Sequence, residues 1–189
     1  IQAVPFFEGK KKCLDYLKTE ENVISWTAII TGPSFDWGMC LGFQGFNLST
    51  KTATIVDGGN VRFTTTNIRQ IARSIIAVLE HADDTVNEVV FVESFITTQH
   101  ELLPVLEKVT REKWKIVEES SEEIRAFGAR AFAEGNLMVG GGALLKALIL
   151  GKDVSTDHTE VEGGIWNTRV GLPKENLEEE VRAIVGSAT

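Results

Sequence analysis

Cysteine is scarce in this sequence, with Cys13 and Cys40 as its two cysteines among 189 residues. Two thiols cannot build a disulfide framework, and a chain long enough to bury a good hydrophobic core does not need one. The three histidines, at positions 81, 100 and 158, are scattered, and neither Cys-x-x-Cys nor His-Glu-x-x-His occurs. A Gly-x-Ser-x-Gly elbow is also missing. We therefore expect a reducing compartment, the cytoplasm, no metal and no covalent nucleophile.

Long apolar runs and an excess of positive charge are missing too. The longest apolar stretch near the C-terminal third, Ala143–Leu150, has eight residues and contains Lys146, whereas a membrane-spanning helix needs about 20. No basic and then apolar leader opens the sequence, so secretion has no support. The chain has 19 basic and 27 acidic residues, a formal charge of −8, which repels a nucleic-acid backbone. We expect no membrane segment and no nucleic-acid partner.

Short apolar strands alternate with amphipathic helices along the chain. Apolar residues make up 43% and charged residues 24%, which is ordinary globular usage. Period-two and buried apolar runs predict strands at 25–30, 52–56, 61–65, 88–92 and 114–117. Helical spacing and two capping boxes predict helices at 7–18, 67–79, from 98, 120–134 and from about 177. This alternation predicts an α/β fold.

Two glycine-rich segments indicate breaks in regular structure. Asp57–Asn60 supplies the positive-φ positions of a tight turn, so we expect 52–56 and 61–65 to form a hairpin. Gly140-Gly141-Gly142 superficially resembles a phosphate-binding turn, but the third glycine of that fingerprint would fall at Leu145. We interpret this segment as a flexible break over a substrate pocket rather than as a phosphate cradle.

One of three adjacent lysines differs from its neighbours by helical phase. Lys10 lies on the same face of the first predicted helix as Leu14 and Leu17, whereas Lys11 and Lys12 point elsewhere. Partial desolvation on an apolar face would suit the amine to proton transfer. The alternative is that the aliphatic stem lies along the helix and the ammonium group reaches water. The pattern alone leaves both interpretations open.

A family resemblance rests on two segments, Phe7-Glu8-Gly9-Lys10-x-x-Cys13-x-x-Tyr16-Leu17 and Trp26-Thr27-Ala28-Ile29-Ile30-Thr31-Gly32-Pro33. Both resemble the central region of the isoflavone-reductase-like, or NmrA-like, family of atypical short-chain dehydrogenases. The resemblance covers nearly the whole chain and is strongest to fungal members at 31–37. It implies the rear part of a Rossmann-like parallel sheet with an appended, mostly helical region that covers the substrate.

The same resemblance implies an NADPH-dependent reductase of a small aromatic or related electrophilic substrate. In that family a lysine of an F-x-x-K helix is the catalytic acid or base, and it maps to Lys10. Thr31, Gly32 and Pro33 map to the loop on the nicotinamide side of the cofactor. The nicotinamide would deliver the hydride, and Lys10 would exchange the accompanying proton.

Three aromatic residues are candidates for the walls of the substrate pocket. Phe35 and Trp37 follow the nicotinamide-side loop, and packing within that loop is the alternative role for both. Trp166 could close the pocket from the C-terminal region, and a place in the core is its alternative.

One family feature has no counterpart in the sequence. The Gly-rich turn that places the cofactor pyrophosphate on a helix N-terminus should precede position 1, and the first residue is Ile1. We therefore expect a back portion whose nucleotide-binding front half is absent, with residues 1–95 completing the Rossmann-like domain and 96–189 forming the substrate side. A non-catalytic NAD(P) sensor of the NmrA type and an inert fragment are the alternatives to a reductase.

Overall fold

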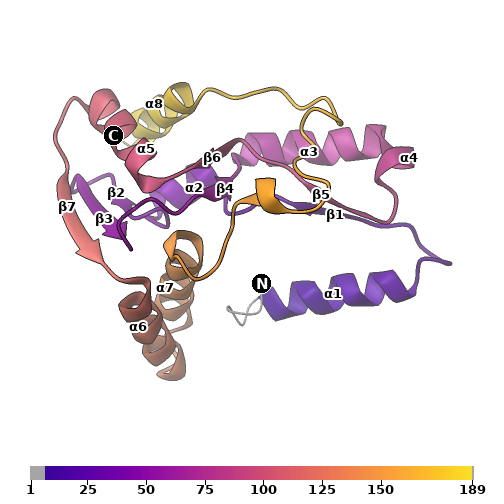
Figure 1. The fold of residues 1–189 in the computed structure, drawn as a ribbon, viewed down its shortest axis with the longest axis horizontal. Helices are drawn as coiled ribbons and strands as arrows, with labels where there is room; N and C mark the ends of the chain where they lie inside the picture. Colours follow the sequence, from indigo (N-terminus) through magenta and orange to yellow (C-terminus); the bar gives the residue numbers. More distant parts are fainter. Residues whose placement is uncertain (1–6, 189) are drawn as a thin grey trace.

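The computed structural model describes residues 7–188, so residues 1–6 and 189, the outer ends of the two expected regions, lie outside the described residues. Helices and strands alternate along the chain (Figure 1). In chain order they are α1 Glu8–Thr19, β1 Thr27–Ile30, α2 Phe35–Cys40, β2 Phe46–Asn47, β3 Thr52–Val56, β4 Phe63–Thr65, α3 Ile68–Glu80, α4 Ala82–Thr85, β5 Glu88–Phe91, β6 Phe95–Thr97, α5 Gln99–Thr110, β7 Lys115–Glu119, α6 Ser121–Ala133, α7 Leu137–Leu150, η2 His158–Glu160 and α8 Leu177–Ala188.

A parallel strand pair forms the Rossmann-like part of the molecule. β1 and β5 run in the same direction, with Ile30 opposite Phe91. Val90 and Val92 are fully buried and pack with Val78 of α3, because branched apolar side chains fit a covered strand. Figure 1 shows α3 on one side of this pair and α1 on the other. The predicted α/β fold with a parallel sheet is confirmed.

The larger core lies among the remaining elements. β3 lies between β2 and β7, antiparallel to the first and parallel to the second, and β4 pairs with β6. Side chains from α2, α5, α7 and α8 fill the space around these strands. The largest fully buried apolar side chains include Phe35, Phe46, Phe63, Leu102 and Leu150.

The predicted hairpin around Asp57 is wrong. Both strands exist, but β3 and β4 belong to different sheets. Asp57, Gly58 and Gly59 have φ values of 47°, 79° and 71°. A two-residue hairpin turn uses two such left-handed positions. Here three successive residues are left-handed, and the chain passes from one sheet into another. The Asp57 carboxylate also accepts hydrogen bonds from the backbone N–H groups of Ser121 and Lys152, at 3.0 and 3.1 Å, which hold the turn against later segments.

The three adjacent glycines are not a flexible break. They lie inside the continuous helix α7, which packs against α6 in a helical hairpin. A Cβ atom on Gly140 would lie 2.7 Å from the backbone nitrogen of Phe132 and 2.8 Å from the carbonyl oxygen of Gly128. Glycine is therefore needed for the close approach of two helices, and the segment presents no phosphate-binding turn.

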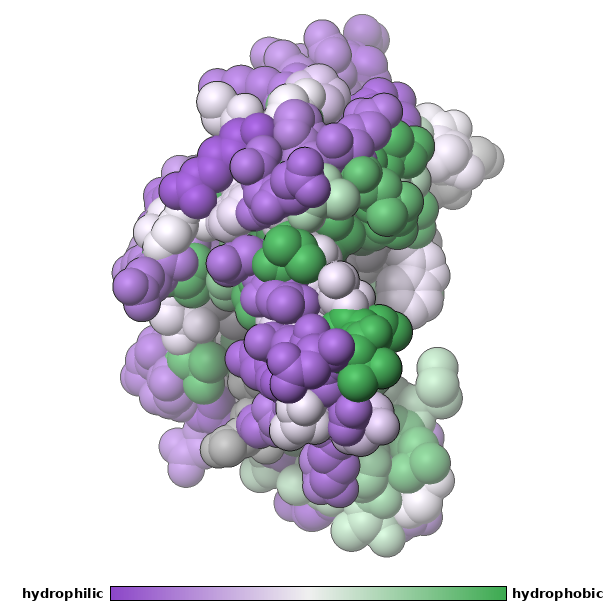
Figure 2. Space-filling model, turned by 90° about the vertical axis from the view of Figure 1, so that its right-hand side faces the viewer, coloured by the Kyte–Doolittle hydropathy of each residue, from purple (hydrophilic) through white to green (hydrophobic). Residues whose placement is uncertain are grey.

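Much apolar surface around the strand pair is exposed. α3 forms where predicted, yet Ile68, Ile75, Ile76 and Leu79 are at least half exposed, and the face it buries carries Gln70, Ser74, Ala77 and Val78 instead. α1 buries none of its residues. Figure 2 looks onto the end of the molecule where α3 ends and β1 begins, and shows apolar areas interrupted by polar ones. Among the described residues, β1 has a hydrogen-bonded neighbour on one side, β5.

Candidate functional site

A rigid loop leaves the carboxyl end of β1, the edge at which parallel α/β sheets bind their ligands. The hydroxyl of Thr66 donates to the carbonyl oxygen of Thr31 at 2.5 Å, and the backbone N–H of Thr66 donates to that of Pro33 at 3.1 Å. Gly32 has a φ of 63°, and a Cβ there would lie 2.4 Å from the carbonyl oxygen of Thr64. Thr31–Pro33 is thus a fixed, half-buried backbone segment that admits glycine alone at its centre.

Glu93 follows β5 at the same edge. Val92 points toward α3, so alternation along the chain directs Glu93 to the opposite face. Its side chain is half-buried, and burial raises the pKa of its carboxyl group, whereas the charge of Lys174 lowers it and that of Asp157 raises it further. A carboxyl group of this kind is a candidate for proton exchange.

Residues 156–167, here called the strap, cross the same edge. At one end the strap exchanges hydrogen bonds with Thr64, at 2.9 and 2.8 Å. At the other, a backbone N–H donates to the carbonyl oxygen of Phe91 at 2.8 Å. The side chain of Asn167 binds both the N–H and the carbonyl group of Glu93, at 3.0 and 2.8 Å. The strap is therefore fastened to β4 and to β5.

The strap presents His158 to this edge. The imidazole ring meets the ring of Phe91 edge-on, with centroids 5.1 Å apart. Its Nδ1 atom is buried and has no hydrogen-bond partner within residues 7–188. Burial lowers the pKa of the imidazole, although the neighbouring charge of Asp157 acts in the opposite direction. Asp157 is itself paired with Arg62 at 2.8 Å, so the ring is neutral near pH 7.

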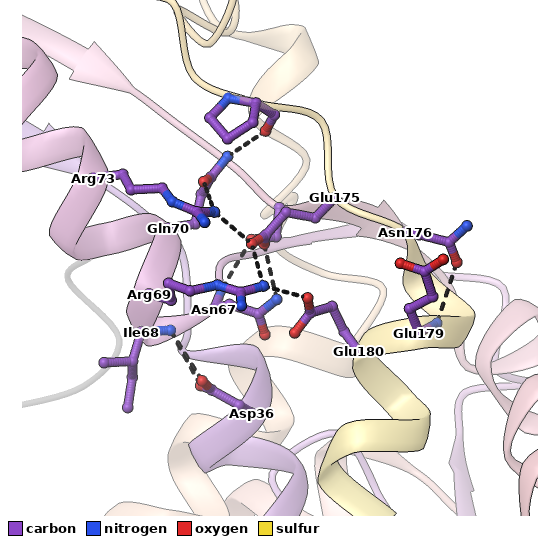
Figure 3. A network of polar contacts seen from close by, with 12 residues as sticks. Asp36, Asn67, Ile68, Arg69, Gln70, Arg73, Glu175, Asn176, Glu179 and Glu180 are labelled. Atoms are coloured by element: carbon purple, nitrogen blue, oxygen red, sulfur yellow. Dashed lines mark hydrogen bonds and ion pairs between the residues drawn. The ribbon is translucent and has the colours of Figure 1, made fainter.

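A buried carboxylate fastens the C-terminal segment to this part of the molecule (Figure 3). The Glu175 side chain is 3% exposed. It accepts hydrogen bonds from Asn67 at 2.9 Å and from Ser94 at 2.5 Å, and pairs with Arg73 at 3.2 Å and Arg69 at 3.4 Å. Since Ser94 directly follows Glu93, the network also fixes the chain beyond β5.

Lys10 lies in the first turn of α1 and is exposed. Its ammonium group lies 5.7 Å from the centroid of the Phe7 ring. The predicted inward orientation is not observed in the described chain: Lys10 is exposed, whereas Leu14 and Leu17 on the same face are partly buried. In Figure 1, α1 runs opposite to β1, so its first turn lies toward the same end as the loop at 31–33.

The three aromatic candidates lie in different surroundings. Phe35 is fully buried in the large core and contacts the ring of Phe95 edge-on, with centroids 5.0 Å apart. This position fits its alternative role as a packing residue. Trp37 is 56% exposed and contacts Phe43. Trp166 packs with the small core on the α3 side of the strands, which fits its alternative as a core residue. Trp37 is the aromatic candidate that remains open to solvent.

Three residues of this region were not predicted from the sequence. Glu93, directly after a predicted strand, carried a usable signal, since polar residues at carboxyl ends of parallel strands often bind ligands. His158 opens the single-turn 3-10 helix η2 and Glu175 lies in an irregular segment, and their partners are distant in sequence. No pattern could have found them.

Other kinds of site find no support in residues 7–188. No cluster of side chains there could hold a metal ion, and no described helix is long and apolar enough to cross a membrane. Two hollows of about 490 and 510 Å³ lie away from the strap, one lined by residues such as Cys40 and Lys51 and one between α3 and the start of β1.

No family model matches the chain. The chain is 30% identical over 166 residues to the oxidoreductase poxI of Penicillium oxalicum, covering 85% of this chain and 52% of the relative. It is 26% identical over 180 residues to the oxidoreductase aprR of Aspergillus flavus, covering 95% and 60%. The chain thus spans about half the length of the curated relatives it matches.

Solved structures with the same fold share less sequence. AtPrR2 with NADP+ and (+)pinoresinol superposes with a TM-score of 0.70 at 18% identity, covering 97% of this chain and 59% of that one. Isoflavone reductase superposes with a TM-score of 0.68 at 13% identity, covering 95% and 59%. The chain therefore shares its fold with part of AtPrR2 and of isoflavone reductase, and it is homologous to the fungal oxidoreductases poxI and aprR.

Proposed function

We propose that the protein to which this chain belongs is an NADPH-dependent reductase of a small aromatic or related electrophilic substrate. The observation that carries the proposal is the fixed, half-buried loop Thr31–Pro33 at the carboxyl end of a parallel strand, in a chain homologous to oxidoreductases. The solved structure of AtPrR2, which shares the fold, holds NADP+ and (+)pinoresinol.

The described residues fit one end of the cofactor. Thr31–Pro33 would line the nicotinamide, because this backbone is rigid and partly open. The pyrophosphate needs a helix N-terminus behind a Gly-rich turn. The α7 glycines cannot supply one, since they lie inside a continuous helix and Gly140 packs against α6. A front half would bring that turn, pair with the open side of β1 and cover α1. The cofactor supplies the hydride.

Lys10 is the proposed proton-exchanging residue. Its neighbours Lys11 and Lys12 are engaged on the helix surface, where they pair with Asp15 and Glu8. Lys10 has no such carboxylate partner within residues 7–188. A front half packed against α1 would remove water from its ammonium group, which favours release of a proton.

The test compares Lys10→Ala with Lys11→Ala in the full-length protein. Lys10→Ala should lower kcat by about 10²–10⁴, the usual contribution of a general acid or base, and leave NADPH affinity within about threefold. Lys11→Ala should change neither, because its side chain is exposed. NADPH oxidation with a panel of small aromatic electrophiles measures turnover, and cofactor fluorescence measures binding. Full turnover by Lys10→Ala would refute its catalytic role. A wild-type protein that binds NADPH but does not oxidise it with any acceptor in the panel would indicate a sensor.

A further inference from the structure

The strap holds the ring of His158 against the ring of Phe91. Two fastenings, to Thr64 and to Phe91, fix the backbone on either side of the ring. The ring itself makes no hydrogen bond within residues 7–188, and its Nδ1 atom is buried. A buried polar atom without a partner costs about 1–3 kcal/mol, and such exceptions often mark a functional site.

The surroundings of the ring define what it can bind. Phe91 provides an apolar wall at 5.1 Å between ring centroids. The carboxyl groups of Glu93 and Asp157 lie close enough to influence each other, and Asp157 influences His158. Arg62 is already engaged with Asp157, and Lys174 is the other nearby cation. An anionic ligand would meet these carboxylates, whereas an uncharged aromatic one would not.

The geometry points to His158 as a ligand-binding residue that hydrogen-bonds a hydroxyl group of an uncharged aromatic substrate at the carboxyl ends of β1 and β5. Since Nδ1 is buried, Nε2 is the ring nitrogen that would meet the ligand. A hydroxyl group suits it because a hydroxyl both donates and accepts, so it pairs with either neutral tautomer of the ring. The face that carries His158, Phe91 and Glu93 is the one opposite α3, which is the side of the strand pair on which α1 lies. This inference rests on the proposed function, because it assumes a small substrate at this edge.

The experiment uses the full-length protein with NADP+, labelled with ¹⁵N in histidine. Three probes share the acetophenone scaffold and differ only in the substituent at ring position 4: 4-hydroxyacetophenone, 4-methoxyacetophenone and 4-carboxyacetophenone. The hydroxy probe should shift the ring resonances of His158 saturably and bind about three- to tenfold more tightly than the methoxy probe, which is the worth of one hydrogen bond. The carboxy probe should bind most weakly. His81 and His100, which lie elsewhere, are internal controls.

Two variants separate binding from packing. His158→Phe keeps a ring against Phe91 but removes both nitrogens, so affinity for the hydroxy probe should fall three- to tenfold and the preference for hydroxy over methoxy should disappear. His158→Gln, which can donate and accept, should restore part of that preference. A merely structural role would lower thermal stability without changing the preference.

The outcomes distinguish this inference from the proposed function. If His158→Phe keeps the hydroxy preference, or if no probe shifts the His158 resonances in the wild type, the inference is wrong, whether or not the protein reduces substrates. If the preference depends on His158 but no acceptor supports NADPH oxidation, the inference holds and the proposed reductase activity fails. Probe binding in the presence of NADP+ requires no turnover.

Discussion

Asp57 joins three segments through one carboxylate at a left-handed backbone position. Its φ is 47°, and it accepts hydrogen bonds from the hydroxyl and N–H groups of Ser121 and from the N–H of Lys152. Burial would raise the pKa of this carboxyl group, but the hydrogen bonds from Ser121 and Lys152 outweigh it and the pKa is lowered. The folded protein therefore binds this proton less readily than the unfolded chain does.

Asp57→Asn should make folding less sensitive to acid. Because the folded pKa is below the unfolded value of about 3.9, the stabilisation is complete above that value and is lost as the pH falls through the folded pKa. Asparagine tolerates the left-handed conformation, so the variant keeps the backbone while it removes the charge and replaces one acceptor oxygen by an NH2 group. We expect a loss of about 1–2 kcal/mol at pH 7 and a smaller fall in unfolding free energy between pH 5 and 3, measured by urea denaturation. Equal acid sensitivity in both proteins would contradict the assignment.

Glu175 should matter far more than its neighbour Glu180. Glu175→Gln places an amide NH2 among donors from Asn67, Ser94 and Arg73. We expect a loss of roughly 2–3 kcal/mol in unfolding free energy, in the range for hydrogen bonds to charged groups. Glu180→Gln removes an ion pair with Arg69, whose side chain is 61% exposed. This variant should lose less than about 1 kcal/mol of unfolding free energy. Similar losses from the two variants would show that the buried network is not the stronger anchor.

At the scale of elements, local signals predicted more than long-range ones. The capping boxes at Thr98 and Ser120 are formed as expected, and α5 and α6 begin directly after them. These signals act over three residues, so sequence alone reveals them. Pairing of β3 with β7 joins residues about 60 positions apart, and no local pattern distinguishes it from a hairpin.

The candidate site divides in the same way. The resemblance singled out Thr31–Pro33 because that motif is contiguous, and its role at the nicotinamide stays a prediction. His158 reaches the site through the strap, whose partner Thr64 lies 94 residues away. The apolar periodicity of α3 predicted a helix correctly, but it did not reveal which face is buried, since that depends on what packs there.

Gly140→Ala should disturb the crossing of α6 and α7. The new Cβ would meet backbone atoms of Phe132 and Gly128, which cannot move aside as a side chain could. We expect a loss of about 1–3 kcal/mol, the usual cost of overpacking. Gly186→Ala is the matched control, because it lies in α8 with no atom within 4 Å of the added Cβ, and it should stabilise by up to about 1 kcal/mol. Thermal unfolding of both variants measures the difference, and an unchanged Gly140→Ala would refute the close crossing.

At the scale of the whole molecule, the surface beside the strand pair should make the isolated chain associate. Leu79 is 72% exposed and lies beside Ile76, at 58%, and β1 offers an open edge. Sedimentation of the 189-residue chain should show association that rises with concentration and falls in Leu79→Lys. Met138→Lys, at an 88% exposed position on α7, should have no such effect. A wild type that stays monomeric at every concentration would contradict the expectation.

The Glu175 network has a consequence for the order in which the protein is made. Its carboxylate lies 108 residues after Asn67 and 81 after Ser94, and synthesis proceeds from the N-terminus. The amide of Asn67 and the hydroxyl of Ser94 therefore leave the ribosome long before the Glu175 carboxylate that accepts their hydrogen bonds. The edge that carries the candidate site acquires this fastening only after Glu175 has been translated, so a nascent chain that stalls before Glu175 carries an unfinished site.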